Sequence, residues 1–284
     1  MARIAYVNGR YRPLDRPAVP VEERGFQFAD GVYEVVKVVG GRCRDLERHI
    51  ARLNRSLAAL AIAWPMSPAA FRAVLAETLR RNGLRDALLY VQITRGAAPR
   101  DHLFPRAARP SLVVTVRRPK RPPARDVEQG VAVVTRPDER WARCDIKSIS
   151  LLPNVLARQA AGEQGCREAW LIDPDRGVVT EGSGSNAYIV DALGRVRTHP
   201  LGPAILGGVT REVVLELARA AGIDVVEMPF TLTEAEAAPE AFMSSTSSWV
   251  LPVTRIDGRE IADGRPGPVT RRLMRLYTER VRHA

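Results

Sequence analysis

A short basic segment rich in proline divides this chain of 284 residues into two halves. Residues 117–125 read Arg-Arg-Pro-Lys-Arg-Pro-Pro-Ala-Arg. Prolines interrupt helices and sheets and neighbouring like charges repel, so such a segment is typical of a linker rather than of a core. We place the boundary within residues 118–125. We therefore expect a smaller N-terminal α/β domain at 1–120 and a larger C-terminal domain at 121–284, each long enough for its own core.

Hydrophobic periodicity predicts strands and helices in both halves, which favours a two-domain fold of the α+β or α/β class. In the first half we expect a hairpin about Asn8-Gly9, strands at 32–39, 87–94 and 111–116, and helices at 44–62 and 68–82. In the second half we expect strands at 131–135, 169–173, 177–181 and 241–244, helices at 152–163 and 209–221, and an arginine-rich C-terminal helix.

The net charge of +11 raises the hypothesis of a basic nucleic-acid-binding protein. The arginines are spread over the whole chain, aromatic residues make up 6%, and no nucleic-acid motif is present, so we expect no nucleic-acid partner. No apolar run has the length of a membrane span and the N-terminus lacks a signal-peptide pattern, which predicts a cytoplasmic protein without a membrane partner. Cys43, Cys144 and Cys166 form no metal-binding or disulfide pattern.

Lysine is rare in this chain, although lysine and arginine together number 43. It occurs only at Lys37, Lys120 and Lys147, and Lys147 lies between a short apolar run and a predicted helix. An amine can lose its proton and attack a carbonyl to form a Schiff base, whereas a guanidinium stays charged. Lys147 is therefore a candidate covalent residue. The alternative is a surface lysine, or one held in a structural ion pair.

Several weaker signals lie at the ends of predicted elements. Glu181 ends a strand and is followed by small hydroxylic residues. Glycines precede the helix that begins at Val209 and Thr210, and exposed N–H groups at such a start suit a phosphate, although many helices begin this way without an anion. Thr246 lies in a hydroxyl-rich turn that either holds an anion or caps a strand.

Two arginines and a histidine have less certain roles. Arg100 and His102 share a short loop bounded by prolines, which is a plausible lid for a carboxylate, although a solvated loop is the more common form of such a segment. Arg52 lies off the apolar stripe of the helix predicted at 44–62, and this position predicts a solvated side chain.

Together these residues match the needs of pyridoxal phosphate, which requires an amine for its aldehyde, a carboxylate for its ring nitrogen and donors for its phosphate. Lys147 supplies the amine and Glu181 the carboxylate. The phosphate donors are Arg52, the Val209 and Thr210 amides, and Thr246. A carboxylate keeps the ring protonated, so that the ring accepts electrons when the substrate Cα–H bond breaks.

Over essentially its whole length the chain resembles the fold type IV pyridoxal-phosphate enzymes, also called class IV aminotransferases, and among them the D-amino-acid aminotransferases. The motifs that carry the resemblance lie at residues 23–38, 49–53, 94–105, 143–148, 180–186 and 208–211. The lysine and glutamate motifs are those of the superfamily. The Arg-Asp-His loop at 100–102 and the strand containing Tyr33 indicate the D-specific branch.

The resemblance implies a cofactor between the two domains, with Lys147 as the Schiff-base lysine and the acid/base that moves the substrate proton. It implies that Glu181 pairs with the ring nitrogen and that Arg52, Val209, Thr210 and Thr246 hold the phosphate. It also implies a homodimer with shared active sites, in which Tyr33 and the partner's Arg100 and His102 positions trap the substrate carboxylate. The implied reaction is a ping-pong transfer from a D-amino acid, such as D-alanine or D-glutamate, to 2-oxoglutarate or pyruvate.

Two residues depart from the D-specific pattern, namely Gly184, where a serine is usual, and Trp249, where a smaller or acidic residue is usual. They leave open the range of substrates. Branched-chain L-aminotransferases, aminodeoxychorismate lyases and R-selective amine transaminases are the alternatives, because they keep the lysine and the glutamate but change the carboxylate trap. The preferred amino acid and 2-oxo acid, the physiological direction and any assembly beyond a dimer also stay open.

Overall fold

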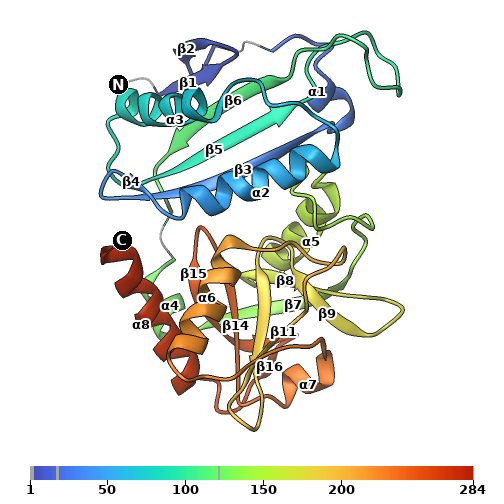
Figure 1. Ribbon diagram of the computed structural model, residues 1–284. Coiled ribbons are helices and arrows are strands. Elements are labelled where there is room, and N and C mark those ends of the chain that lie inside the picture. The colour runs from blue at the N-terminus through green and yellow to red at the C-terminus, as the bar shows by residue number, and fades with distance from the viewer. Residues whose placement is uncertain (1–2, 17–18, 121, 284) are drawn as a thin grey trace. The chain divides into compact units, whose positions relative to one another are not determined.

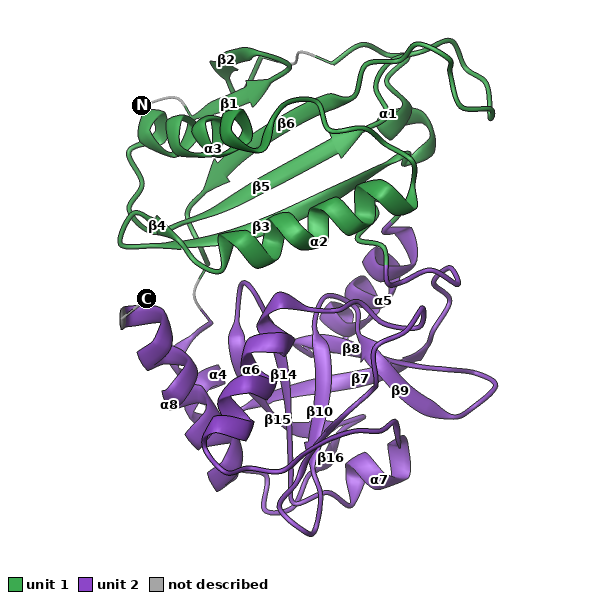
Figure 2. Ribbon diagram, in the orientation of Figure 1, with its two compact units in different colours: residues 1–120, 146–150 green, residues 121–145, 151–284 purple. Residues whose placement is uncertain are grey.

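The computed structural model describes residues 3–16, 19–120 and 122–283, and these form two compact units (Figure 2). Unit 1 comprises Met1–Lys120 and Ile146–Ser150, and unit 2 comprises Arg121–Asp145 and Leu151–Ala284. The sequence-based division at residue 120 had assigned 146–150 to the second half. These residues belong to unit 1 because their backbone bonds to a strand of that unit.

In unit 1, the described residues form a six-stranded antiparallel sheet in the order β2-β1-β6-β5-β3-β4 (Figure 1). Its elements are β1 (Ile4–Val7), β2 (Arg10–Pro13), α1 (Arg24–Phe28), β3 (Gly31–Val39), β4 (Arg42–Cys43), α2 (Leu46–Ala59), α3 (Pro68–Asn82), β5 (Ala87–Thr94) and β6 (Ser111–Arg117).

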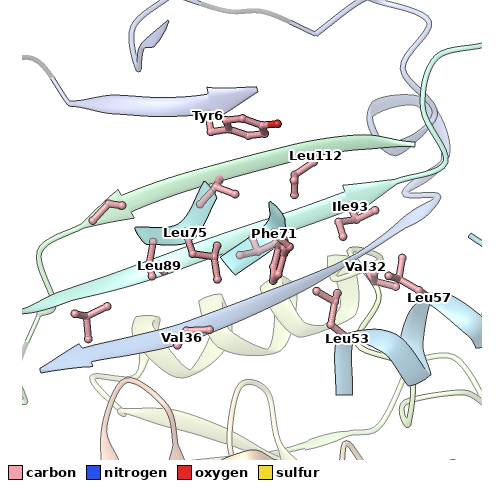
Figure 3. Close-up of a cluster of buried hydrophobic side chains, with 14 of the residues drawn as sticks. Tyr6, Val32, Val36, Leu53, Leu57, Phe71, Leu75, Leu89, Ile93 and Leu112 are labelled. Carbon is pink, nitrogen blue, oxygen red and sulfur yellow. The ribbon is translucent and has the colours of Figure 1, made fainter. Parts of the chain in front are cut away.

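The core of unit 1 lies between this sheet and the helices α2 and α3. Leu53 and Leu57 of α2 and Phe71 and Leu75 of α3 are fully buried, and Figure 3 shows them among the side chains of β3, β5 and β6. Side chains alternate between the two faces of a strand, so one face of β3 meets the helices and the other carries Tyr33. A strand of this unit therefore presents an apolar face to the core and a second face to a site.

In unit 2, the described residues form a ten-stranded mixed sheet in the order β12-β11-β10-β14-β15-β7-β8-β9-β13, with β16 beside β15. Its elements are α4 (Ala124–Gln129), β7 (Val131–Pro137), α5 (Leu152–Glu163), β8 (Glu168–Ile172), β9 (Val178–Gly182), β10 (Asn186–Val190), β11 (Val196–Thr198), α6 (Val209–Ala220), β12 (Val225–Glu227), β13 (Phe230–Thr231), α7 (Leu232–Glu236), β14 (Glu240–Ser245), β15 (Trp249–Ile256), β16 (Arg259–Glu260) and α8 (Pro268–His283).

The predicted helices at 68–82 and 152–163 coincide with α3 and α5, and the predicted hairpin about Asn8-Gly9 is present as β1 and β2. The strands β10 to β13, β15 and β16 and the short helices α1, α4 and α7 were not predicted. Most of these elements are too short for a periodic pattern to be recognised. Among the described residues, every helix falls short of the length and apolar character that crossing a bilayer requires.

Candidate active site

Lys147 is positioned by the edge of β3. The N–H of Tyr33 donates to the Lys147 carbonyl at 3.0 Å, and the N–H of Ile149 donates to the carbonyl of Gly31 at 3.0 Å. The Lys147 N–H donates to Ser56 Oγ of α2 at 3.2 Å. These bonds place the side chain of Ile146 in the core of unit 1 and leave that of Lys147 half-buried.

The amine of Lys147 lies against an aromatic pair. Its Nζ is 4.1 Å from the ring centroid of Tyr33, and the rings of Tyr33 and Tyr90 are 5.8 Å apart. The Tyr90 hydroxyl donates to Gln92 Oε1 at 2.7 Å, and burial raises the pKa of Tyr90 to about 12. Two predicted site residues, Lys147 and Tyr33, are therefore in contact, on a surface where the second phenol keeps its proton at neutral pH.

Arg52 is buried, and this corrects the expectation of a solvated side chain. Its Nε and Nη2 donate to the two oxygens of Glu34 at 2.7 and 2.8 Å, and His49 Nδ1 is hydrogen-bonded to Glu34 at 2.7 Å. Burial opposes ionisation of Glu34, but the charge and hydrogen bonds of Arg52 outweigh it and lower the Glu34 pKa to about 2. Ser56, which contacts Lys147, is one helical turn after Arg52, so both side chains are on the same face of α2.

Arg100 and His102 are exposed on their loop. Both contact Phe28 at the end of α1, with the guanidinium carbon of Arg100 4.6 Å and the His102 ring 5.5 Å from the Phe28 ring centroid. Within the described chain, neither side chain contacts Tyr33 or Lys147. The predicted carboxylate trap is therefore not assembled by the contacts of unit 1.

In unit 2, Glu181 of β9 is surrounded by donors. Its Oε1 accepts from Nη1 of Arg140, its Oε2 accepts from Nδ2 of Asn186 at 2.9 Å, and the Leu206 N–H is shared between both oxygens at 3.1 and 3.2 Å. Burial raises the pKa of Glu181, and the nearby charge of Arg140 only partly offsets that effect.

Asp138 competes for the same guanidinium. Arg140 Nε and Nη2 donate to the two oxygens of Asp138 at 2.8 and 2.7 Å, and the Thr180 hydroxyl also donates to Asp138 at 2.7 Å. Although burial opposes it, these bonds lower the pKa of Asp138. The sequence analysis missed Asp138, Arg140 and Asn186. Only Thr180 and Asn186 were near a recognisable motif, since Asp138 and Arg140 follow a strand about 40 residues earlier.

Val209 and Thr210 begin α6, and both side chains are buried. The N-cap of this helix is Gly208, and no side chain caps it. A Cβ at Gly208 would lie 2.1 Å from Asn186 Oδ1, so the close approach requires a glycine. The uncapped N–H groups at the positive end of the helix suit a phosphate.

Thr246 is in the turn between β14 and β15. The register of β10 with β14 pairs Asn186 with Ser244, so this turn begins at the same end of the sheet as Asn186. Of the two departures noted in the sequence, Trp249 has a positive φ of 60° and lies with its ring 5.9 Å from that of Tyr277. Gly184 is exposed, and a Cβ there would have only Glu168 within 4.0 Å.

Comparison with known proteins identifies the relatives of this chain. The model of the class IV amino-transferase family matches residues 31–256. A D-alanine aminotransferase of Bacillus licheniformis is 42% identical over 93% of this chain and 92% of its own, and one of Listeria innocua is 39% identical over 97% and 95%. A branched-chain amino acid aminotransferase from T.th., complexed with N-(5′-phosphopyridoxyl)-L-glutamate, superposes with a TM-score of 0.89 at 26% identity, over 99% of this chain and 94% of its own.

Proposed function

We propose, since the chain belongs to the class IV aminotransferases, that it moves the amino group of a D-amino acid to a 2-oxo acid. D-alanine and D-glutamate are the donors we expect, with pyruvate or 2-oxoglutarate as acceptor. The observation that carries the proposal is the identity of about two residues in five, over more than nine-tenths of both chains, with D-alanine aminotransferases.

The proposed cofactor is pyridoxal 5′-phosphate, the group to which the phosphopyridoxyl ligand of the branched-chain relative is related. When bound, it supplies an aldehyde that takes up the amino group and a ring that accepts the electrons of the Cα–H bond. The donor set fits this group, because the residues provide an amine, a buried carboxylate and an uncapped helix start. Lys147 and Glu181 would hold the aldehyde and ring ends, and Arg52, Val209, Thr210 and Thr246 the phosphate.

We propose that Lys147 moves the substrate proton. As a neutral amine, its Nζ would take the proton from Cα and return it on the same face of the reacting group. The ring of Tyr33 lies beside Nζ, so the face of Tyr33 and Lys147 is the one that the substrate would approach. Stereospecificity would then depend on how the substrate carboxylate is held.

We propose that Tyr33 and the Arg100 and His102 pair of a second copy hold that carboxylate, in a homodimer with shared active sites. Two observations support this arrangement. Arg100 and His102 are exposed and do not contact Tyr33 within the described residues. The same loop exposes Leu103 and Phe104 by 75% and 60%, and apolar side chains grouped in this way mark contact surfaces.

Branched-chain L-amino acid transfer is the second candidate function. It is favoured by the superposition on the branched-chain relative. The two functions predict different substrates on the same cofactor. The visible absorption spectrum of the protein saturated with pyridoxal 5′-phosphate separates them, since a productive substrate depletes the band of the bound cofactor. We expect depletion by D-alanine and none by L-isoleucine. The reverse result would establish the branched-chain reaction, and a missing band would refute the role of Lys147.

Subunit complementation tests the shared site. Lys147→Ala and Arg100→Ala each remove one residue, and we expect each variant alone to lose D-alanine turnover. In a mixed dimer, the Lys147 of one subunit would meet the Arg100 of the other in one intact site. Mixing the two variants should therefore restore activity if the loop acts across subunits. No recovery in dimers shown to have exchanged subunits would mean that Arg100 acts within its own chain or not at all.

A further inference from the structure

The trio of Asp138, Arg140 and Glu181 is buried and unbalanced in charge. The side chains are exposed by only 11%, 7% and 6%. Arg140 donates to Asp138 through Nε and Nη2 and to Glu181 through Nη1, so one guanidinium serves two carboxylates. Among the described residues, no second basic side chain forms an ion pair with either acid. With both acids ionised, the trio carries one net negative charge.

Glu181 keeps room for one more donor. A carboxylate offers about four acceptor positions on its two oxygens. Arg140, Asn186 and the Leu206 N–H occupy three, with the Leu206 N–H divided between the oxygens at 3.1 and 3.2 Å. A fourth donor that carries a positive charge would complete the hydrogen bonding and neutralise the trio. In a buried site that charge balance matters more than it does in water.

We propose that Asp138 and Arg140 are positioning residues that prepare Glu181 for a protonated ring nitrogen. Arg140 holds the carboxylate of Glu181 in one orientation. Asp138 takes a share of the guanidinium, so the trio retains the negative charge that a pyridinium neutralises. This inference rests on the proposed function, because it takes Glu181 as the residue facing the ring nitrogen of pyridoxal phosphate.

The trio also determines which acid holds a proton when no ring is present. Arg140 and Thr180 keep Asp138 ionised by their hydrogen bonds and lower its pKa, whereas burial raises the pKa of Glu181 and favours its protonated form. The proton of the unpaired trio therefore sits on Glu181, and Glu181 becomes a carboxylate when the ring nitrogen bears the proton. A residue that only tethered the chain would leave the protonation of the ring unchanged when its charge is removed.

The test is the protonation of the ring in the holoenzyme. The ¹⁵N chemical shift of [¹⁵N]pyridoxal 5′-phosphate is followed against pH in the wild type, in Glu181→Gln and in Asp138→Asn, together with cofactor affinity from fluorescence titration. Asp138→Asn keeps the shape and removes the charge. We expect its ring nitrogen to titrate roughly one pH unit lower than in the wild type, and its cofactor affinity near neutral pH to be roughly tenfold weaker.

Glu234→Gln is the matched control. Glu234 also pairs with a buried arginine of unit 2, since Arg197 Nη1 donates to it at 2.8 Å. Glutamine at this position removes the charge and can still cap α7, in which Glu234 accepts from the Thr231 N–H at 2.8 Å. We expect the titration of the ring nitrogen in this variant to match that of the wild type. A shift as large as that of Asp138→Asn would mean that any lost charge in the unit has the effect, and would overturn the inference.

Each outcome separates the inference from the proposed function. If Glu181→Gln lowers the ring titration and Asp138→Asn does not, the inference fails and the proposed function stands. If neither variant changes it, Glu181 does not face the ring and both fail. A wild type that binds no cofactor refutes the function itself. If Asp138→Asn does not fold, Thr180→Val replaces it, because it removes the hydroxyl that donates to Asp138; we expect a smaller shift in the same direction, and no shift overturns the inference.

Discussion

Each unit buries a glutamate against an arginine, yet the two glutamates have opposite electrostatic properties. In unit 1, Glu34 takes two donors of Arg52 and a bond from His49, and its pKa falls to about 2. In unit 2, Glu181 shares Arg140 with Asp138, and burial raises its pKa. Both carboxylates are almost completely shielded from water. The number of carboxylates per guanidinium, rather than burial, accounts for the difference.

The comparison separates a pair that stabilises the fold from a set that is prepared for a ligand. A balanced buried pair with satisfied donors is costly only when one partner is removed. A buried set with an excess charge lowers the stability of the unliganded protein, and a ligand of opposite charge recovers that free energy on binding. Glu34 therefore belongs with the scaffold that holds Arg52, and Glu181 with the chemistry.

The largest effect is expected for Glu34→Gln. This change leaves the buried Arg52 without its carboxylate partner Glu34, and removing one partner of a buried pair costs roughly 3–5 kcal/mol. Urea unfolding of the cofactor-free protein measures the loss. The matched control is Glu47→Gln on the same helix as Arg52, which breaks the exposed pair with Arg72 and should leave stability nearly unchanged. Equal losses in the two variants would contradict the distinction between buried and exposed pairs.

The pH dependence of that loss sharpens the comparison. The pKa of Glu34 is lowered from 4.5 to about 2, so its stabilising contribution is complete above pH 4.5 and disappears as the pH falls towards 2. The contribution is on the order of 3 kcal/mol. We expect the stability difference between wild type and Glu34→Gln to shrink across this interval in unfolding experiments. A difference that is as large at pH 3 as at pH 7 would show that Glu34 is not ionised by Arg52.

Glu181→Gln should affect turnover far more than folding. Without the negative charge the ring nitrogen loses the partner that keeps it protonated, and we expect kcat to fall roughly 10²-fold, as for loss of one preorganised electrostatic group. The loss of stability in the cofactor-free protein should be smaller than for Glu34→Gln, because the wild-type trio already carries an excess charge. Steady-state kinetics and urea unfolding on the same preparations measure both quantities. A variant as unstable as Glu34→Gln would place Glu181 with the scaffold.

Two glycine substitutions give the smallest effects and compare packing near the two glutamates. A Cβ at Gly31, close to Glu34 in β3, would meet the Ile93 carbonyl oxygen at 2.8 Å, so Gly31→Ala should cost roughly 1–3 kcal/mol. The exposed Gly184, close to Glu181 in sequence, has room for a side chain, and Gly184→Ser should change stability by less than about 0.5 kcal/mol. Thermal unfolding compares them. The reverse order would mean that the segment after Glu181 is the more tightly packed.

Much of the fold and part of the site were accessible from sequence. Periodic patterns predicted α3 and α5 at their observed bounds, because long amphipathic helices repeat their signal over several turns. Lys147 was conspicuous because arginine replaces lysine almost everywhere else. The burial of Arg52 was not predicted, since hydropathy assigns a charged side chain to solvent unless its partner is known, and that partner is Glu34 on a strand 18 residues away.

The sequence by itself determined which chemical groups this protein has: one distinctive lysine, a glutamate at a strand end, and a glycine-preceded helix start. These are local properties, set by residue type and by neighbours along the chain. Only the tertiary structure decided the charge state of each group, because that depends on which cations and acids come within a few ångströms. It brought Asp138 and Arg140 to Glu181, and it attached Lys147 to the edge of β3 in unit 1 although most of the chain around it belongs to unit 2.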